Sequence, residues 1–242
     1  RVWFDWGYEL LYPNHYIVLL SPSGRTRKTT ATHMALDMIH RSAARVIYSP
    51  NKTSTERFVS DMAGGVIMHK AGDSIITETL PMVAFSGELS VLISAREKVS
   101  GITNILDEIY TCPPTFKAST HIRGVEDIPE PCVNLLASTT PVWLKKNIGD
   151  QLLEEGFFGR IIWVYQTEPK CRDMFPEMTP EKLLQRSLLV DMLKDYQHLA
   201  GGMILRPEAK EFYQAWYRGL KPSEESNLDA FVQRIHHHAL KL

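Results

Sequence analysis

The amino-acid sequence predicts an α/β fold, a mainly parallel sheet flanked by helices. An apolar run at residues 15–20 turns through Ser-Pro-Ser-Gly into a helical pattern over 28–41, and a short apolar run follows at 44–48. Two further apolar runs, 79–88 and 131–141, are each followed by helical spacing. Because parallel strands need crossover connections, this alternation predicts βαβ units with ligands bound beyond the carboxyl ends of the strands.

Composition and charge narrow the functional classes. A chain of 242 residues with 44% hydrophobic residues can bury a full core in one main domain, and a net charge of −1 provides no global basic field for nucleic acid. No apolar run approaches the ~18 to 20 residues of a membrane span. Cys112, Cys132 and Cys171 are odd in number and far apart in the sequence, which favours a reducing, cytoplasmic setting over a disulfide framework.

The turn after the first apolar run is typical of a phosphate-binding loop. A strand that restarts as a helix leaves several backbone N–H groups at the positive end of the helix dipole. Lys28 would reach the β- and γ-phosphates, and the Thr29 hydroxyl would be a ligand of Mg²⁺. The residues predicted to line this loop are Ser23, Gly24, Arg25, Thr26, Arg27, Lys28, Thr29 and Thr30.

The loop departs from the pattern G-x-x-x-x-G-K-[ST] in two places. Pro22 stands in place of the first glycine, and Arg27 precedes the lysine. Since Arg27 cannot adopt a positive φ cheaply, the loop is expected to be one residue longer than usual or tightened at Gly24. The alternative is an ordinary strand-turn-helix with an exposed basic turn.

Between the first and second βαβ units, the sequence predicts a helix and a short strand. Glu56 lies three residues after Thr53, which is the spacing of a capping box, and a helix is expected over 53–62. A short strand at 66–69 is expected between glycine turns.

An acidic residue ends the 79–88 run. Glu88 is placed to activate the water that attacks a γ-phosphate, and its carboxylate would also be a ligand of Mg²⁺. Gly87 and Ser86 stand where an aspartate that helps to hold Mg²⁺ is expected. The alternative is a glutamate favoured at a helix N-terminus by the helix dipole. Asp107 and Glu108 are expected on a solvated helix face.

The 131–141 run ends in small hydroxyl residues. Ser138, Thr139 or Thr140 at this strand tip could hold the attacking water or sense the γ-phosphate. The alternative is that these residues only end the strand and cap a helix that starts near Val142.

Arg160 follows two phenylalanines and a glycine and precedes the apolar run 161–165. An arginine held rigidly in this way could act on a phosphate as an arginine finger, in its own site or in that of a neighbouring subunit. An ordinary surface arginine is the alternative.

The chain becomes mainly helical after about residue 171, so the sequence divides into a core at 1–170 and a helical C-terminal region at 171–242, which is expected to be truncated from a longer polypeptide. Gly201-Gly202 is interpreted as a break between helices. His236, His237 and His238 are consecutive, and a regular helix directs them about 100° apart, which disfavours a shared metal ion.

In this order, the segments resemble the P-loop ATPase domain of phage, plasmid and prophage replication proteins, a primase-associated, helicase-like family. The resemblance covers nearly the whole chain and rests on NHYIVLLSPSGRTRKTT, VAFSGELSVLI, VNLLASTTPVWL, EEGFFGRIIWVY, ILRPEAKEFYQAWY and RIHHHALKL. It implies a RecA/AAA-like core in a ring, usually a hexamer, that binds ATP and Mg²⁺ between subunits and pulls single-stranded DNA through its centre. It also implies a bacterial host cell and an associated primase domain or primase protein.

The resemblance implies a role for each matching residue. Lys28 and Thr29 would hold phosphates and Mg²⁺, Glu88 would polarise water, Thr139 or Thr140 would be the sensor, and Arg160 would act on ATP. The basic residues considered for DNA contact are Lys117, Arg123, Lys145 and Lys146. Two other readings stay open: an ATP-binding scaffold or regulatory module with weak or no hydrolysis, and a kinase of a small metabolite.

Overall fold

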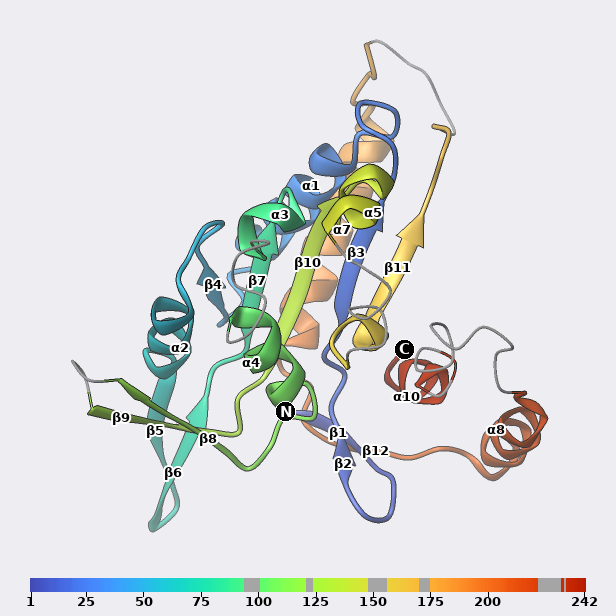
Figure 1. Cartoon of the computed structure of the whole chain (residues 1–242). Helices are drawn as coiled ribbons and strands as arrows, with labels where there is room; N and C mark the ends of the chain where they lie inside the picture. Colours follow the sequence, from blue (N-terminus) through green and yellow to red (C-terminus); the bar gives the residue numbers. More distant parts are fainter. Residues whose placement is uncertain (94–100, 121–123, 148–155, 170–174, 222–231, 233) are drawn as a thin grey trace.

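The computed structural model is built around a five-stranded, all-parallel sheet with the order β11-β3-β10-β7-β4 (Figure 1). Its strands are β3 (Tyr16–Leu20), β4 (Ile47–Ser49), β7 (Met82–Ser86), β10 (Val133–Thr139) and β11 (Ile161–Tyr165). The structure describes residues 1–93, 101–120, 124–147, 156–169, 175–221, 232 and 234–242. The predicted α/β class with a mainly parallel sheet is thus confirmed.

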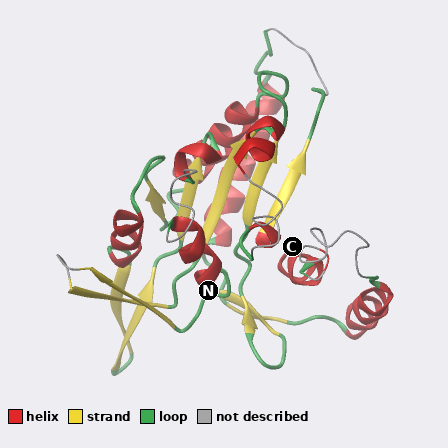
Figure 2. Ribbon diagram, in the orientation of Figure 1, coloured by secondary structure: helices red, strands yellow, loops and turns green. Residues whose placement is uncertain are grey.

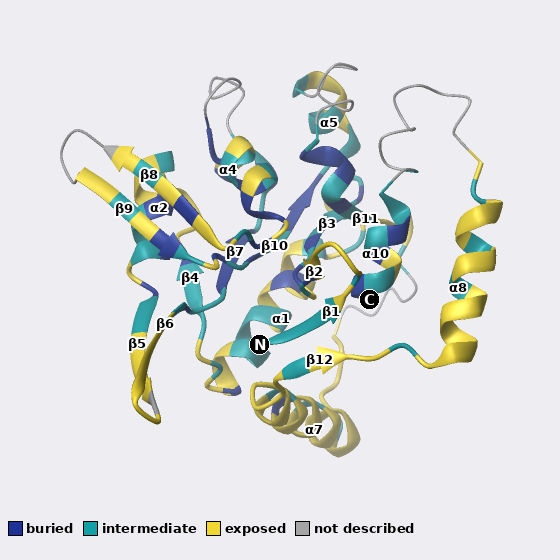
Figure 3. Ribbon diagram, turned by 90° about the horizontal axis from the view of Figure 1, so that it is seen from below, coloured by how far each residue is buried: buried dark blue, intermediate teal, exposed yellow. Residues whose placement is uncertain are grey.

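Helices cover both faces of the sheet (Figure 3). One face carries α1 (Lys28–Arg41) and α7 (Pro180–Tyr196), and the other carries α4 (Ile102–Ile109) and α5 (Pro141–Asn147). All five residues of β7 are buried, as a central parallel strand requires. The predicted helix over 28–41 is confirmed, and His40 and Arg41 in its last turn complement the helix dipole.

The remaining helices near the sheet are short. They are α3 (Leu89–Leu92) after β7 and the 3₁₀ helix η1 (Phe158–Arg160) before β11. Two helical patterns of the sequence run into residues that the structure does not describe. The pattern after Glu88 extends into 94–100, and the pattern over 144–156 includes 148–155.

Two hairpins extend beyond the β4 edge of the sheet (Figure 2). They are β5 (Val66–Ala71) with β6 (Ser74–Thr79), and β8 (Thr115–Thr120) with β9 (Gly124–Pro129); α2 (Thr55–Ala63) lies beside them. The predicted Thr53–Glu56 capping box is wrong, because the N-cap of α2 is Ser54, whose hydroxyl accepts a hydrogen bond from the Arg57 N–H at 3.3 Å.

A second, three-stranded sheet joins the N-terminal segment to residues 201–203. Its strands are β1 (Val2–Asp5), β2 (Leu10–Leu11) and β12 (Gly201–Met203), and β12 pairs with β1 in parallel. Gly201-Gly202 does lie between two helices, one that ends at Tyr196 and one that begins at Pro207, but the strand that these glycines form was not predicted. Glycine has a low strand propensity, and here tertiary pairing overrides it.

Of the C-terminal helices, α7 and α10 (Ile235–Lys241) contact the core, and α8 (Pro207–Gly219) lies apart from the sheet (Figure 1). Lys241 donates a hydrogen bond to Asn14 Oδ1 at 2.8 Å, and its carbonyl lies 3.1 Å from His15 Nε2. On the opposite face, Arg186 of α7 forms an ion pair with Asp37 of α1. Within the described part of the chain, no helix has the length and apolar character needed to cross a membrane.

Candidate functional site

Three loops meet at the carboxyl edge of the parallel sheet. They follow β3, β7 and β10, and β10 lies between the other two strands. Thr139 is paired with Leu20 on one side, and Ala137 is paired with Ser86 on the other. This register places Glu88, two residues after Ser86, level with Thr139 and beside the loop that follows β3. Binding sites in open α/β sheets occupy this edge.

The segment that we call the 21–30 loop consists of the connection 21–27 between β3 and α1 and the first three residues of α1, and it has two residues in the left-handed region. Gly24 has a φ of 71°, and Arg27 has a φ of 53° immediately before the helix begins at Lys28. The expectation that Arg27 avoids a positive φ is therefore wrong. A residue with a side chain costs about 1–2 kcal/mol in this conformation. The sharp reversal from loop to helix requires it here.

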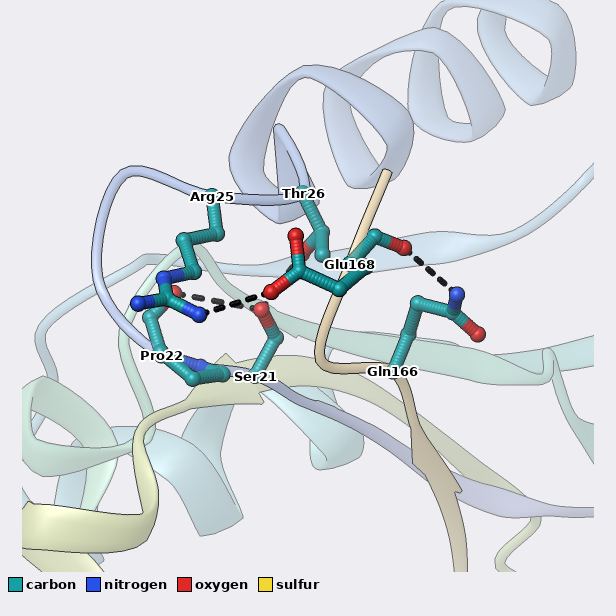
Figure 4. Close-up of polar contacts among 6 residues, drawn as sticks. All are labelled: Ser21, Pro22, Arg25, Thr26, Gln166 and Glu168. Carbon is teal, nitrogen blue, oxygen red and sulfur yellow. Dashed lines mark hydrogen bonds and ion pairs between the residues drawn. The ribbon is translucent and has the colours of Figure 1, made fainter. Parts of the chain in front are cut away.

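Side chains on both sides brace this loop (Figure 4). The Thr26 hydroxyl donates a hydrogen bond to Ser21 Oγ at 2.6 Å, which closes the loop across its base. Arg25 forms an ion pair with Glu168 at 2.8 Å, in the segment after β11, although both side chains are more than half exposed. Ser23 and Gly24, at the tip, are exposed.

Lys28 turns back over the loop. Its ammonium group donates hydrogen bonds to the Ser21 carbonyl at 2.7 Å and to the Pro22 carbonyl at 3.4 Å. Desolvation lowers the pKa of Lys28, and the charge of Glu88 opposes that shift. The lysine therefore lies at the mouth of the loop, close enough to the Glu88 carboxylate, which follows β7, for the two charges to interact.

Glu88 and Thr139 are held together. The Thr139 hydroxyl, whose residue is fully buried, donates a hydrogen bond to Glu88 Oε1 at 3.1 Å. Ser138, beside it, donates to the Gly87 carbonyl and fixes the backbone before Glu88. Glu88 is the N-cap residue of α3, yet its side chain makes no capping hydrogen bond there. Its carboxylate therefore faces the 21–30 loop side of the edge rather than the helix.

Thr140 has a different position from Thr139. Its hydroxyl accepts a hydrogen bond from the Trp143 N–H at 3.2 Å, so that it caps α5. Thr140 therefore caps a helix, as the alternative interpretation of this segment expected, whereas the Thr139 hydroxyl is directed to Glu88.

The first turn of α1 lies directly against Gly87. A Cβ atom added to Gly87 would be 3.6 Å from Thr29 Cγ2 and 3.9 Å from His33 Nε2. Thr29, Thr30 and His33 also line a shallow cavity of about 360 Å³, which Met34, Asp37 and Arg186 complete. His33 was not among the predicted site residues. The available signal was its position four residues after Thr29, on the same helix face.

Oxygen donors for a divalent cation are present at this edge. Mg²⁺ is commonly held by one or two carboxylates together with substrate phosphates and water. The Glu88 carboxylate and the Thr29 hydroxyl fit that donor set. Among the residues that the structure describes, no three His, Cys, Asp or Glu side chains are grouped closely enough to bind a metal ion by themselves.

Arg160 lies at the other end of the sheet. It immediately precedes β11, and Ile161 is paired with Tyr16, the first residue of β3. Its guanidinium forms an ion pair with Asp107 and lies 5.6 Å from the centre of the Tyr110 ring. Arg160 is therefore separated from the 21–30 loop of its own chain by the length of β3, about 13 Å. Glu108 is exposed, as expected, and Asp107 is partly exposed and forms the ion pair with Arg160.

The basic residues considered for DNA contact are scattered. Lys117 forms an ion pair with Asp127 at 2.9 Å on the β8–β9 hairpin. Lys145 and Lys146 are exposed in the last turn of α5. Arg123 lies outside the described residues.

A larger cavity of about 650 Å³ lies at the amino-terminal side of the sheet. It is lined by β1, the β12–α8 connection, α8 and α10, and its aromatic residues include Trp6, Tyr8, Tyr213 and Tyr217. The three loops of the carboxyl edge do not contribute to it, so size alone does not identify the site.

Two cysteines that are distant in the sequence meet in the structure. Cys112 and Cys132 share a side-chain hydrogen bond, which raises the pKa of Cys112 and lowers that of Cys132. Their sequence separation therefore did not indicate their spatial separation. Cys171 lies outside the described residues.

Comparison with known proteins adds no assignment, since no family model matches this chain and no curated protein is significantly similar to it.

Proposed function

We propose that this chain is a Mg²⁺-dependent ATPase that works as a replication helicase or single-strand DNA translocase, with the 21–30 loop as its P-loop. One observation carries the ATPase part of the proposal: a lysine at the start of a helix, a carboxylate and a buried hydroxyl converge from three neighbouring strand ends. These groups are Lys28, Glu88 and Thr139. The DNA part rests on the resemblance of the sequence to phage and plasmid replication ATPases.

The arrangement suggests a division of labour in hydrolysis. Lys28 would exchange its long bond to the Pro22 carbonyl for a γ-phosphate oxygen. Glu88, held by Thr139, would orient the water that attacks the γ-phosphorus in line with the leaving oxygen. Mg²⁺, held by Thr29 and Glu88 with the phosphates, would supply charge neutralisation. The α1 N-terminus would add its dipole.

In this proposal Arg160 acts in trans, on ATP bound by the neighbouring subunit of a ring. Its distance from the 21–30 loop of its own chain favours this over action in cis. The test is a mixture of Lys28→Ala and Arg160→Met subunits, each inactive alone. A site shared between the two would contain one intact lysine and one intact arginine, so turnover should return in the mixture. Continued inactivity of mixed rings would exclude the trans role.

The first experiment measures ATP turnover with and without single-stranded DNA, together with mass in solution with a non-hydrolysable ATP analogue. Lys28→Ala is the blank, and Lys52→Ala, outside the site, is the matched control. We expect DNA-stimulated turnover and a nucleotide-dependent ring. Absence of nucleotide binding in the unmodified chain would refute the proposal.

A second candidate is an ATP-binding scaffold that hydrolyses slowly or not at all. Gly87 favours it, because this position gives the metal no carboxylate. Glu88→Gln separates the two. In a hydrolase the variant should retain ATP that the unmodified chain turns over, whereas in a scaffold the two proteins should hold ATP equally.

A further inference from the structure

The His33 imidazole lies beside Gly87, the position at which an aspartate was expected. A Cβ at Gly87 would lie within 4 Å of both the Thr29 side chain and His33 Nε2, so these two side chains bound the space that a carboxylate at position 87 would enter. His33 and Thr29 are on the same face of α1, one turn apart. The helix that carries Thr29 therefore also presents a nitrogen to this space, and the Thr29 atom nearest to it is the methyl carbon Cγ2.

The His33 ring is oriented and accessible. It packs edge-on against Phe85 of β7, with ring centres 5.4 Å apart and an interplanar angle of 60°. This contact directs Nε2 towards the end of β7, where Gly87 and Glu88 follow. His33 is exposed, and it also lines the shallow cavity beside Thr29, so a ligand can reach the ring from solvent.

Resting on the proposed nucleotide function, we propose that His33 Nε2 is a ligand of the divalent cation bound with the nucleotide, in place of a carboxylate at position 87. A neutral imidazole is a common metal ligand. Thr29 and Glu88 would supply oxygen donors to the same cation.

This donor set changes which cation the site prefers. Mg²⁺ favours oxygen ligands in near-ideal octahedral geometry. Mn²⁺, a first-row transition metal, binds at sites with both nitrogen and oxygen ligands and accepts an imidazole more readily than Mg²⁺ does. A site with one nitrogen, one carboxylate and one hydroxyl should therefore favour Mn²⁺. Replacing the nitrogen by a carboxylate should shift the preference towards Mg²⁺.

The direct test is pulsed EPR of Mn²⁺ bound with a non-hydrolysable ATP analogue, on protein labelled with ¹⁵N-histidine. We expect a ¹⁵N coupling of the size produced by a directly bound imidazole. It should vanish in His33→Ala and persist in His40→Ala, the matched control. His40 is on the same helix, where it stacks on Tyr48 at 4.1 Å, away from Gly87.

A second measurement uses metal affinity. In His33→Ala/Gly87→Asp, the ratio of Mn²⁺ to Mg²⁺ affinity in the presence of the analogue should fall at least tenfold relative to the unmodified chain. The fold should tolerate Gly87→Asp, because a Cβ there makes only ordinary van der Waals contacts. An unchanged ratio would contradict the role of His33.

Failure of this inference and failure of the proposed function are distinguishable. If the analogue binds in a Lys28-dependent manner but bound Mn²⁺ shows no histidine ¹⁵N coupling, His33 is not a ligand and the nucleotide site stands. If the analogue does not bind, the proposed function fails, and with it the role of His33.

Discussion

The buried Thr139 hydroxyl donates a hydrogen bond to Glu88 Oε1 at 3.1 Å and thereby links the ends of two adjacent parallel strands. A carboxylate on a short loop would otherwise sample several rotamers, and this bond restricts it. Among the described residues, no hydrogen bond occupies the second carboxylate oxygen of Glu88, which can therefore face a ligand or water. Thr139 is thus a positioning residue for the proposed hydrolysis.

Thr139→Val should lower ATP turnover by about 10- to 100-fold, the range for losing a hydrogen bond that orients a functional side chain, and leave nucleotide affinity within a few-fold. The valine keeps the shape and removes the hydroxyl. Thr139→Ser, which keeps the hydroxyl, should retain most turnover, and Thr140→Val should affect helix stability instead. Steady-state kinetics and analogue titration measure both quantities. Equal loss in the serine and valine variants would contradict the positioning role.

Arg27→Gly should be more stable than Arg27→Ala by about 1 kcal/mol. Residue 27 has a φ of 53°, which glycine adopts without the steric cost that alanine meets. Both variants remove the arginine side chain, so their difference isolates the backbone. Urea unfolding of the two variants gives the difference, and an alanine variant as stable as the glycine variant would show that the residue is not strained.

Arg160→Met should destabilise the fold by about 2–3 kcal/mol, because it leaves the partly buried carboxylate of Asp107 without its cation. Asp107→Asn, which spares the arginine, should cost a similar amount. Unfolding free energies of both variants test this pairing. A stable Arg160→Met protein that has lost turnover would show that the arginine serves catalysis alone.

Acidification should weaken the fold through His237. Burial, with the neighbouring charges of His236 and Lys241, lowers the pKa of His237 from 6.5 to about 4. Between these values the unfolded chain binds a proton that the folded chain does not, so the unfolding free energy falls as the pH decreases from about 6.5 towards 4. With allowance for partial exposure, we expect about 1–2 kcal/mol from this group.

The check is urea unfolding at pH 7.0 and 4.5 for the unmodified chain and for His237→Gln. The glutamine variant should lose less stability on acidification. It should still lose some, because burial also lowers the pKa values of His15 and His238. Identical losses in the two proteins would mean that the pKa of His237 is the same in the folded and the unfolded chain.

Local patterns in the sequence were sufficient to predict the parallel core. The β3 strand, the α1 helix and the β11 strand were predicted within a residue of their observed limits, because each has a clear apolar period and a turn at its end. Gly201 shows where such patterns fail. Its strand exists only through pairing with β1, a contact that no local window contains.

The candidate site was predictable in type and less so in detail. Loop composition and strand tips indicated Lys28, Glu88 and the Ser/Thr group, but only the register of β10 distinguishes Thr139 from Thr140. Arg160 illustrates the limit: its sequence neighbours predict rigidity, whereas its distance from the loop depends on which end of the strand it occupies. His33 was missed because its relation to Gly87 crosses between two elements.

The parallel pairing of Val2 with Gly201 has a consequence for synthesis of the protein. During translation, β1 waits for its partner until residue 203 has left the ribosomal tunnel, while the strands between them emerge earlier. At about 5–20 residues per second, this interval lasts on the order of 10–40 s. The nascent chain therefore exposes the unpaired edge of β1 during this interval, when a chaperone or another chain could bind it.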